Sequence, residues 1–466
     1  MSFDPMNIFE ELQRMIEKAQ AKQRSIFLSP DKVGQVVRVG DKLMFLDVAR
    51  SMYSDMWIFI GIDEDGSIVP LMDMNEMGSA KVYQRLARLQ PPKTVPYFEE
   101  LEAVERASPK DVYVEVRELN EQLVVMPRIE LYDFLALYNM SSWLHTLCDK
   151  KPFLFVTGFF GTGKSMVGSL IRQFARHPFD LLSSTSQSVL WTFGLTRGIG
   201  IIDETDRLSA TFRMLLRRLH DEGISIVKMM VDEYGWSLLS LNLSSPIVLI
   251  GTHLPEDPAL LSRGFIIKMH YGKPARTMRS MQNELYVLRL KMIKAMLTSW
   301  KRYLEMLEKA SKELDSMDIH ERYKDIAVPI VATAMLCDAD WSWISLMIKY
   351  SASASAFQIK TNRAILYIVE KLRKETNAVA GVVALTEHEM KLLIDEASER
   401  VGLSDAERKY ITTYFVSASE PCTVDGEPGF CFSYGDILGA LKLYKGIYFV
   451  VDRKKGTVEL KEFEAK

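Results

Sequence analysis

The stretch Gly158-Phe159-Phe160-Gly161-Thr162-Gly163-Lys164-Ser165 fits the P-loop pattern G-x-x-x-x-G-K-[ST]. It follows Phe153-Leu154-Phe155-Val156, a short apolar run that is typical of a buried parallel strand. Apolar residues then recur at helical spacing, at Met166, Val167, Leu170, Ile171 and Phe174. The sequence therefore predicts a strand, a glycine-rich loop and a helix. The loop's backbone N–H groups would lie at a helix N-terminus, where anionic phosphate is favoured.

The residues of this loop have separate expected roles. Its glycines let the backbone wrap closely around phosphate groups without a Cβ clash. Lys164 is expected to reach the β and γ phosphates, and the Ser165 hydroxyl is expected to bind Mg²⁺. The expected cofactors are therefore ATP and Mg²⁺, and the expected nucleotide-binding residues of the loop are Gly158, Gly161, Thr162, Gly163, Lys164 and Ser165. The alternative is a glycine-rich turn in which Lys-Ser occurs by chance.

A second apolar run, Gly198 to Ile202, ends in the adjacent carboxylates Asp203 and Glu204. We expect it to be the strand next to the P-loop strand. Asp203 would then hold the Mg²⁺, and Glu204 would orient and deprotonate the attacking water. Adjacent residues that leave a strand point to opposite sides, which suits one carboxylate facing metal and one facing water. The alternative is an ordinary strand end with two acidic residues.

A third apolar run, Pro246 to Gly251, is followed by Thr252 and later by Leu260-Leu261-Ser262-Arg263. In this order, the phosphate loop, the Asp-Glu strand, the polar residue and the arginine resemble the AAA+ ATPases. The resemblance implies that Thr252 senses the γ-phosphate and helps to place the water. It also implies that Arg263 is a catalytic finger that reaches a neighbouring subunit's nucleotide. The alternative for Arg263 is a surface arginine that pairs with a carboxylate.

Within the AAA+ family, the chain resembles the ATPase cores of plasmid and phage replication proteins, a group similar to viral superfamily 3 and minichromosome-maintenance helicases. Three stretches support this, at 183–191, 224–243 and 322–341. The last resembles the helical lid, in which Arg322 would be a second sensor that binds nucleotide. The chain departs from the pattern because Thr252 stands where many relatives carry Asn, and because no primase module or zinc motif is attached.

The second of these stretches predicts a β-hairpin. Ile224 to Val231 and Trp236 to Leu243 are expected to pair through the turn 232–235, in which Gly235 permits positive φ. In the related helicases such a hairpin points into the central channel. The expected DNA-binding residues are therefore Lys228 for a phosphate contact, and Tyr234 and Trp236 for stacking. The alternative is a solvent-exposed hairpin with one lysine.

Composition and breaker residues set the domain organisation. The chain has 466 residues and a net charge of −3, which predicts no global attraction to nucleic acid. Its four cysteines lack Cys-x-x-Cys spacing, which favours a reducing cytoplasm. No stretch approaches the length of a membrane span. We expect an α+β N-terminal domain (1–127) for oligomerisation or substrate engagement, an α/β P-loop core with a central parallel sheet (128–272), a helical lid and extension (273–380), and a C-terminal domain (381–466).

The C-terminal domain is expected to resemble a winged helix. Thr386 with Glu389 and Ser404 with Glu407 match capping boxes, so two helices are predicted to begin there. A third helix is predicted over 433–444, followed by a hairpin of 447–451 and 457–460. Such domains bind duplex DNA or other proteins.

The pattern as a whole favours an oligomeric ATP-hydrolysing motor on DNA, with a hexamer as the expected assembly, acting as a replicative helicase of a mobile element or virus. The alternatives are a protein remodeller or loader without unwinding activity, and a switch that binds ATP without turnover.

Overall fold

The computed structural model describes most of the chain, namely residues 33–39, 41–52, 57–73, 95–158, 161–181, 193–194, 196–203, 205, 210–221, 225–232, 235–252, 254–255, 257–317, 319–375, 382–417, 420–424, 427–433, 447–452 and 457–462. These residues form two compact units. The first contains the described residues up to Thr205, together with Met214–Thr252 and Arg263–Ile348. The second contains the described parts of 206–213 and 253–262, and those from Lys349 onward.

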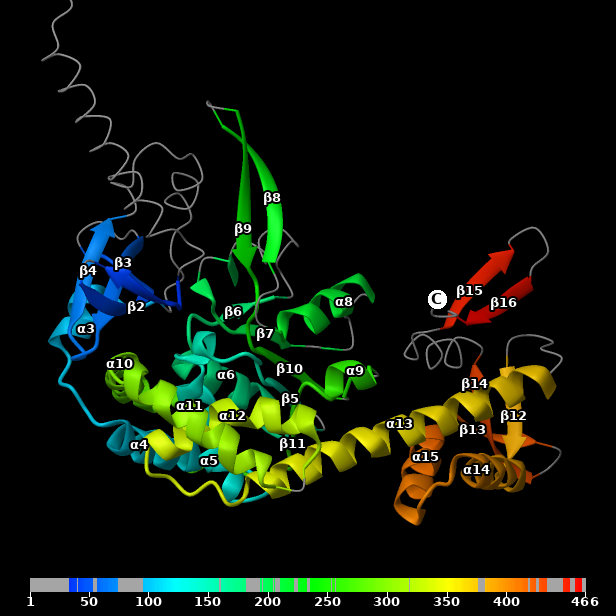
Figure 1. Cartoon of the computed structure of the whole chain (residues 1–466). Helices are drawn as coiled ribbons and strands as arrows, with labels where there is room; N and C mark the ends of the chain where they lie inside the picture. Colours follow the sequence, from blue (N-terminus) through cyan, green and yellow to red (C-terminus); the bar gives the residue numbers. More distant parts are fainter. Residues whose placement is uncertain are drawn as a thin grey trace, which may run out of the picture. The chain divides into compact units, whose positions relative to one another are not determined.

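A five-stranded parallel sheet forms the centre of the first unit (Figure 1). Its strands, in spatial order, are β11 (Gly264–Lys268), β5 (Phe153–Thr157), β10 (Ile247–Gly251), β7 (Gly200–Asp203) and β6 (Phe179–Asp180). The three inner strands are almost continuously apolar and buried, as expected for a parallel sheet that is covered on both faces. The predicted central parallel sheet is therefore present, and it is compatible with an α/β nucleotide-hydrolase core.

One prediction about this sheet is wrong. The strand that ends at Asp203 is not the neighbour of the P-loop strand, because β10 lies between β5 and β7 and pairs with both. Continuously apolar strands have no alternation that would reveal their neighbours. Their order depends on crossover connections that local sequence does not specify. The error matters for the site, because it moves Thr252 to a position between the phosphate loop and Asp203.

Helices cover this sheet and extend the unit. Helix α6 (Lys164–Phe174) packs against β5, β7 and β10, and Gly168 permits its close approach, since a Cβ there would lie 2.5 Å from Ile250 Cδ1. Helix α5 (Glu130–Ser141) packs against α6 and is buried along most of its length. The other helices of this unit are α3 (Phe98–Ala103), α4 (Pro109–Leu123), η2 (His145–Leu147), η4 (Met278–Met281), α10 (Gln282–Leu297), α11 (Trp300–Asp315) and α12 (Glu321–Leu336).

Two further sheets belong to the first unit. An antiparallel meander contains β1 (Val36–Val39), β2 (Lys42–Arg50), β3 (Trp57–Asp63) and β4 (Ile68–Asp73). The predicted hairpin is confirmed, as β8 (Ser225–Asp232) pairs antiparallel with β9 (Gly235–Asn242). Of two further helices, α8 (Ala210–Leu219) is divided between the units, and α9 (Pro258–Leu261) belongs to the second unit.

The second unit contains most of the long helix α13 (Ile344–Glu375), from Lys349 onward. The two predicted helix starts are confirmed, because Thr386 and Ser404 exchange capping hydrogen bonds with Glu389 and Glu407. The predicted terminal hairpin is also present. A three-stranded sheet in the order β12-β14-β13 was not predicted. The expected third helix lies outside the described residues, except for its first residue, Ser433, which ends β14. The elements of this unit are β12 (Val382–Thr386), α14 (Glu387–Val401), α15 (Asp405–Ser417), β13 (Glu420–Val424), β14 (Glu427–Ser433), β15 (Ile447–Asp452) and β16 (Thr457–Glu462).

Among the helices that the structure describes, none is both long and apolar enough to span a bilayer.

A buried ion pair connects the N-terminal meander to the central sheet layer. Asp47 on β2 and Arg176, which follows α6, are fully buried, and both guanidinium ends of Arg176 donate to the carboxylate, at 2.5 and 2.6 Å. His177 lies 3.4 Å from the same carboxylate. Burial raises the pKa of Asp47, but the charge of Arg176, the contact with His177 and a hydrogen bond from Val48 N together outweigh it, and the net shift is downward. The carboxylate is therefore ionised in the folded protein.

We predict that Asp47→Ala lowers the free energy of unfolding by about 3–5 kcal/mol, because Arg176 would remain as an uncompensated buried charge. Urea unfolding followed by circular dichroism measures the loss. The control is Lys291→Ala, which removes an exposed ion pair with Glu115 and should cost under about 1 kcal/mol. Equal losses in the two variants would contradict the importance of the buried pair.

Candidate nucleotide site

The P-loop connects the carboxyl end of β5 to the start of α6. Gly158, Gly161 and Gly163 have φ values of +150°, +77° and +87°, a region that favours glycine. At Gly158 a Cβ would lie 2.7 Å from Met269 O, so the close approach of the neighbouring chain also requires glycine. The backbone thus forms a cradle that side chains would fill, which fits the phosphate binding that the sequence predicts.

The start of α6 suits an anion. Gly163 is the N-cap and offers no side chain to cap the helix, and no acidic residue occupies the first turn. The N-terminal N–H groups and the helix dipole therefore face the loop without a competing carboxylate. Lys164 Nζ donates to Gly158 O at 2.6 Å, so the ammonium group lies across the loop. Thr162 is buried, and Ser165 is exposed on the first turn.

Asp203 and Thr252 lie at the same edge of the sheet as this loop. Thr252 follows β10, and its carbonyl accepts a hydrogen bond of 2.9 Å from Thr157 Oγ1. Asp203 is paired with Ile250, which is itself paired with Val156. With roughly 4.8 Å between neighbouring strands, Asp203 lies about 10 Å from the P-loop strand across β10. The structure therefore brings the loop, Thr252 and Asp203 to one edge, while Glu204 lies outside the described residues.

The chain connections place this edge at a topological switch point. From β5 the chain passes through α6 to β6, which is the edge strand on the same side of β5 as β10. From β10 it crosses in the other direction, to β11 on the other side of β5. In open parallel sheets, ligands bind outside the carboxyl ends of neighbouring strands whose connections diverge in this way.

Arg263 lies at the opposite edge of the sheet. It directly precedes β11, its carbonyl accepts a hydrogen bond of 3.0 Å from Phe153 N, and Gly264 is paired with Phe153 at the start of β5. About 13 Å separate the two ends of β5 at 3.3 Å per residue, so the structure does not bring Arg263 to its own P-loop.

The charged surroundings of Arg263 include Asp221. Burial raises the pKa of Asp221, but a hydrogen bond from Lys150 and the charges of His220, Lys150 and Arg263 lower it, and the net shift is downward. A carboxylate is therefore available near Arg263, as the ion-pairing alternative requires.

Arg322 also lies away from its own P-loop. It is exposed in the first turn of α12, where its backbone N–H donates to His320 Nδ1 at 3.3 Å. One turn later, burial raises the pKa of Asp325, which also senses the charges of Lys150 and Asp149 just before β5. The start of α12 is therefore near the amino edge of the sheet, on the side of Arg263.

The hairpin residues are placed by register only. In β8, Lys228 pairs with Leu239, and in β9, Trp236 pairs with Val231. Their side chains, like the whole of Tyr234, are outside the described part of the chain.

Sequence reasoning missed the segment that follows β11. Met269 N donates to Thr157 O at 2.6 Å, and Tyr271 Cε1 lies 3.5 Å from the position that a Cβ on Gly161 would occupy. The Tyr271 side chain is 70% exposed. The strand β11 itself was not predicted, and the available signal was its apolar run followed by an aromatic residue directly before Gly272.

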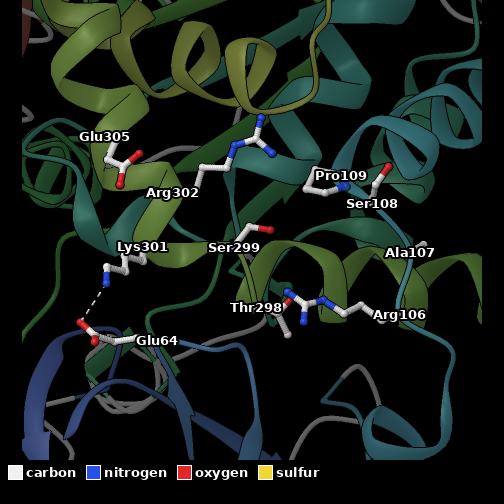
Figure 2. A pocket seen from close by; sticks show the side chains of 10 residues that line it. All are labelled: Glu64, Arg106, Ala107, Ser108, Pro109, Thr298, Ser299, Lys301, Arg302 and Glu305. Atoms are coloured by element: carbon white, nitrogen blue, oxygen red, sulfur yellow. Dashed lines mark ion pairs between the residues drawn. The ribbon is translucent and has the colours of Figure 1, made fainter.

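A separate groove of about 650 Å³ lies between the β3–β4 turn and the start of α11 (Figure 2). It contains both signs of charge. Lys301 pairs with Glu64 at 3.4 Å, and Arg106 donates to the carbonyl of Asp65 at 3.4 Å. Arg302 and Glu305 are also in the lining, so the charges largely offset each other. The groove contains none of the residues predicted to bind nucleotide or metal.

No protein-family model matches the chain, and no curated protein matches it. The solved structures similar to it include the active helicase Cch of SCCmec type IV, with 11% identity, coverage of 88% of this chain and 98% of that chain, and a TM-score of 0.39. They also include the apo C-terminal region of NrS-1 (11% identity, 83% and 96% covered, TM-score 0.29). A full-length MCM homologue from Methanopyrus kandleri is a third (11% identity, 68% and 73% covered, TM-score 0.32). Likenesses at this level assign no activity to the chain.

Buried histidines near the amino edge predict a loss of stability in acid. Burial lowers the pKa of His220 to about 4, and its Nδ1 hydrogen donates to Lys151 O at 2.7 Å. In the unfolded chain this histidine titrates near 6.5, so between pH 6.5 and 4 the unfolded state binds the extra proton and is favoured. The contribution of neutral His220 to the free energy of unfolding is complete above pH 6.5 and decreases as the pH falls.

We predict that the fall from pH 7.5 to pH 5 is smaller by roughly 2 kcal/mol in His220→Gln than in the wild type. The Gln amide can still donate to Lys151 O. Urea unfolding at the two pH values measures the difference, with the exposed His388→Gln as the control. If His220→Gln and wild type lose the same stability, His220 is not the group responsible.

Proposed function

We propose that this protein is an oligomeric AAA+ ATPase that couples ATP hydrolysis to movement on DNA, as a replicative helicase of a mobile element or virus. One observation supports the ATPase most strongly. The phosphate loop and Asp203 lie at the same edge of the parallel sheet, with Thr252 on the strand between them. Phosphate-binding and acidic residues of one site must converge in this way.

Each residue at this edge has a role in the proposed reaction. The loop's N–H groups and Lys164 hold the phosphates, while Ser165 and Asp203 supply oxygen ligands for Mg²⁺, which neutralises developing phosphate charge when bound. Magnesium in such sites takes few protein ligands, because phosphate oxygens and water complete the octahedron. Glu204 follows Asp203 directly and would take the proton of the attacking water, which Thr252 helps to place.

Arg263 is proposed to act on the nucleotide of a neighbouring subunit. Its position at the amino edge supports this, because its backbone lies at the start of β5, about 13 Å along the strand from the end that carries its own P-loop. Arg322 shares this side and is proposed to assist in the same way. A ring, with six subunits as the expected number, would supply each site with a neighbour's arginine. The alternative is that Arg263 only pairs with Asp221.

The DNA contact is proposed to come from the β8–β9 hairpin. Lys228 would contact phosphate, and Tyr234 and Trp236 would stack on bases. The C-terminal domain, as a winged-helix-like domain, and the N-terminal domain would add DNA or subunit contacts. The rival function is a remodeller or loader of proteins, which would use the same ATPase core without responding to DNA.

We predict that Lys164→Ala abolishes ATP binding, whereas Glu204→Gln keeps ATP bound and lowers its turnover at least a hundredfold. Equilibrium binding of a fluorescent ATP analogue and steady-state phosphate release separate the two effects. Normal turnover in Glu204→Gln would contradict its role as the base and would favour a nucleotide-gated switch.

We predict that single-stranded DNA stimulates the ATPase and that Lys228→Ala removes most of this stimulation while the basal rate stays unchanged. Phosphate release measured with and without DNA, over a range of salt concentrations, checks this, because phosphate contacts weaken as salt rises. Lys291→Ala, on α10, is the control. Indifference of the wild-type enzyme to DNA would favour the remodeller.

A further inference from the structure

An aromatic side chain stands beside the P-loop and makes no hydrogen bond or ion pair with another residue that the structure describes. Tyr271 lies three residues beyond β11, whose last residue, Lys268, is paired with Thr157 at the end of the P-loop strand. The hydrogen bond from Met269 N to Thr157 O carries this pairing past the strand end. The position of Tyr271 is therefore set by the strand that also delivers the loop.

The Tyr271 ring lies within reach of a side chain that would extend from the loop at Gly161. Its Cε1 atom is 3.5 Å from where a Cβ on Gly161 would be, and 70% of its surface remains exposed. Covering the exposed face of this ring would be favourable, since burial of apolar surface is worth about 25 cal/mol per Å². A planar ligand group that extends from the loop would cover it.

A second segment approaches the loop with apolar side chains. Val124 Cγ2 is 3.9 Å from the position of a Cβ on Gly163, and Val125 Cγ1 is 2.4 Å from that of a Cβ on Gly272. The absence of a side chain at Gly272 thus lets the Tyr271 segment pass against Val125. The side chains contributed by these two valines and Met269 are apolar, which suits a flat aromatic ring more than a second phosphate.

We propose that Tyr271 is the nucleobase platform of this site: its ring stacks on the base of a nucleoside triphosphate whose phosphates are held by the P-loop. This rests on the proposed function, because it assumes that the loop binds a nucleotide. It adds that the ligand must carry a base, so the site prefers nucleoside triphosphate to bare triphosphate. Stacking on an aromatic face is worth about 1–3 kcal/mol per base, or roughly 5- to 150-fold in affinity.

The test compares ATP with inorganic tripolyphosphate, which has the phosphates but no base. Isothermal titration calorimetry on the full chain gives both dissociation constants for the wild type, Tyr271→Ala and Tyr271→Phe. We expect Tyr271→Ala to weaken ATP binding about tenfold and to leave tripolyphosphate binding unchanged. Tyr271→Phe keeps the ring and is expected to bind ATP as the wild type does.

The control is Tyr286→Ala, which removes another partly exposed tyrosine, on α10, and should alter neither constant. Wild-type affinity for ATP in Tyr271→Ala would overturn the proposal while leaving the nucleotide site intact. An equal loss for ATP and tripolyphosphate would also overturn it, by showing that Tyr271 supports the loop and not the base. Failure of the wild type to bind either ligand would refute the nucleotide site itself, and with it the platform.

Discussion

Parallel pairing between β5 and its two neighbours is the constraint on which the rest of the site depends. Because β10 and β11 both run parallel to β5, the segments that leave all three strands emerge at one edge. That edge gathers the phosphate loop, Thr252 and the Tyr271 segment, although these are far apart in the sequence. Hydrogen bonds from Thr157 Oγ1 to Thr252 and from Met269 to Thr157 extend the pairing beyond the strands. Side-chain chemistry is thus positioned by backbone geometry.

The sequence predicted those parts of this arrangement that depend only on residues close together in the chain. The loop conformation and the start of α6 follow from glycines and helical spacing within a dozen residues, and the capping boxes at Thr386 and Ser404 follow from four-residue patterns. The place of β10 between β5 and β7 could not be predicted in this way, because strand order depends on long crossover connections and on the packing of the whole unit. The same limit explains the missed sheet of β12, β13 and β14, and the missed approach of Tyr271 to Gly161.

The buried ion pair of Asp47 and Arg176 connects parts of the first unit by charge, in addition to apolar packing. Apolar contacts tolerate small displacements, but a desolvated bidentate ion pair is favourable only at close distance and good orientation. Arg176 stands two residues after the end of α6, the helix that begins at the phosphate loop. The N-terminal meander is therefore tied to the far end of the helix that holds the site. His177, with a positive φ of 37°, sits at the same junction.

The separation of Arg263 from its own loop has a consequence for symmetry. If this arginine completes a neighbour's site, the amino edge of one copy must meet the carboxyl edge of the next, so the two contacting surfaces differ. Such heterologous interfaces repeat head to tail, and they either close into a ring or continue as a filament. In a closed ring every subunit both gives and receives an arginine. In an open filament the last loop stays incomplete, so closure itself would add one working site per particle.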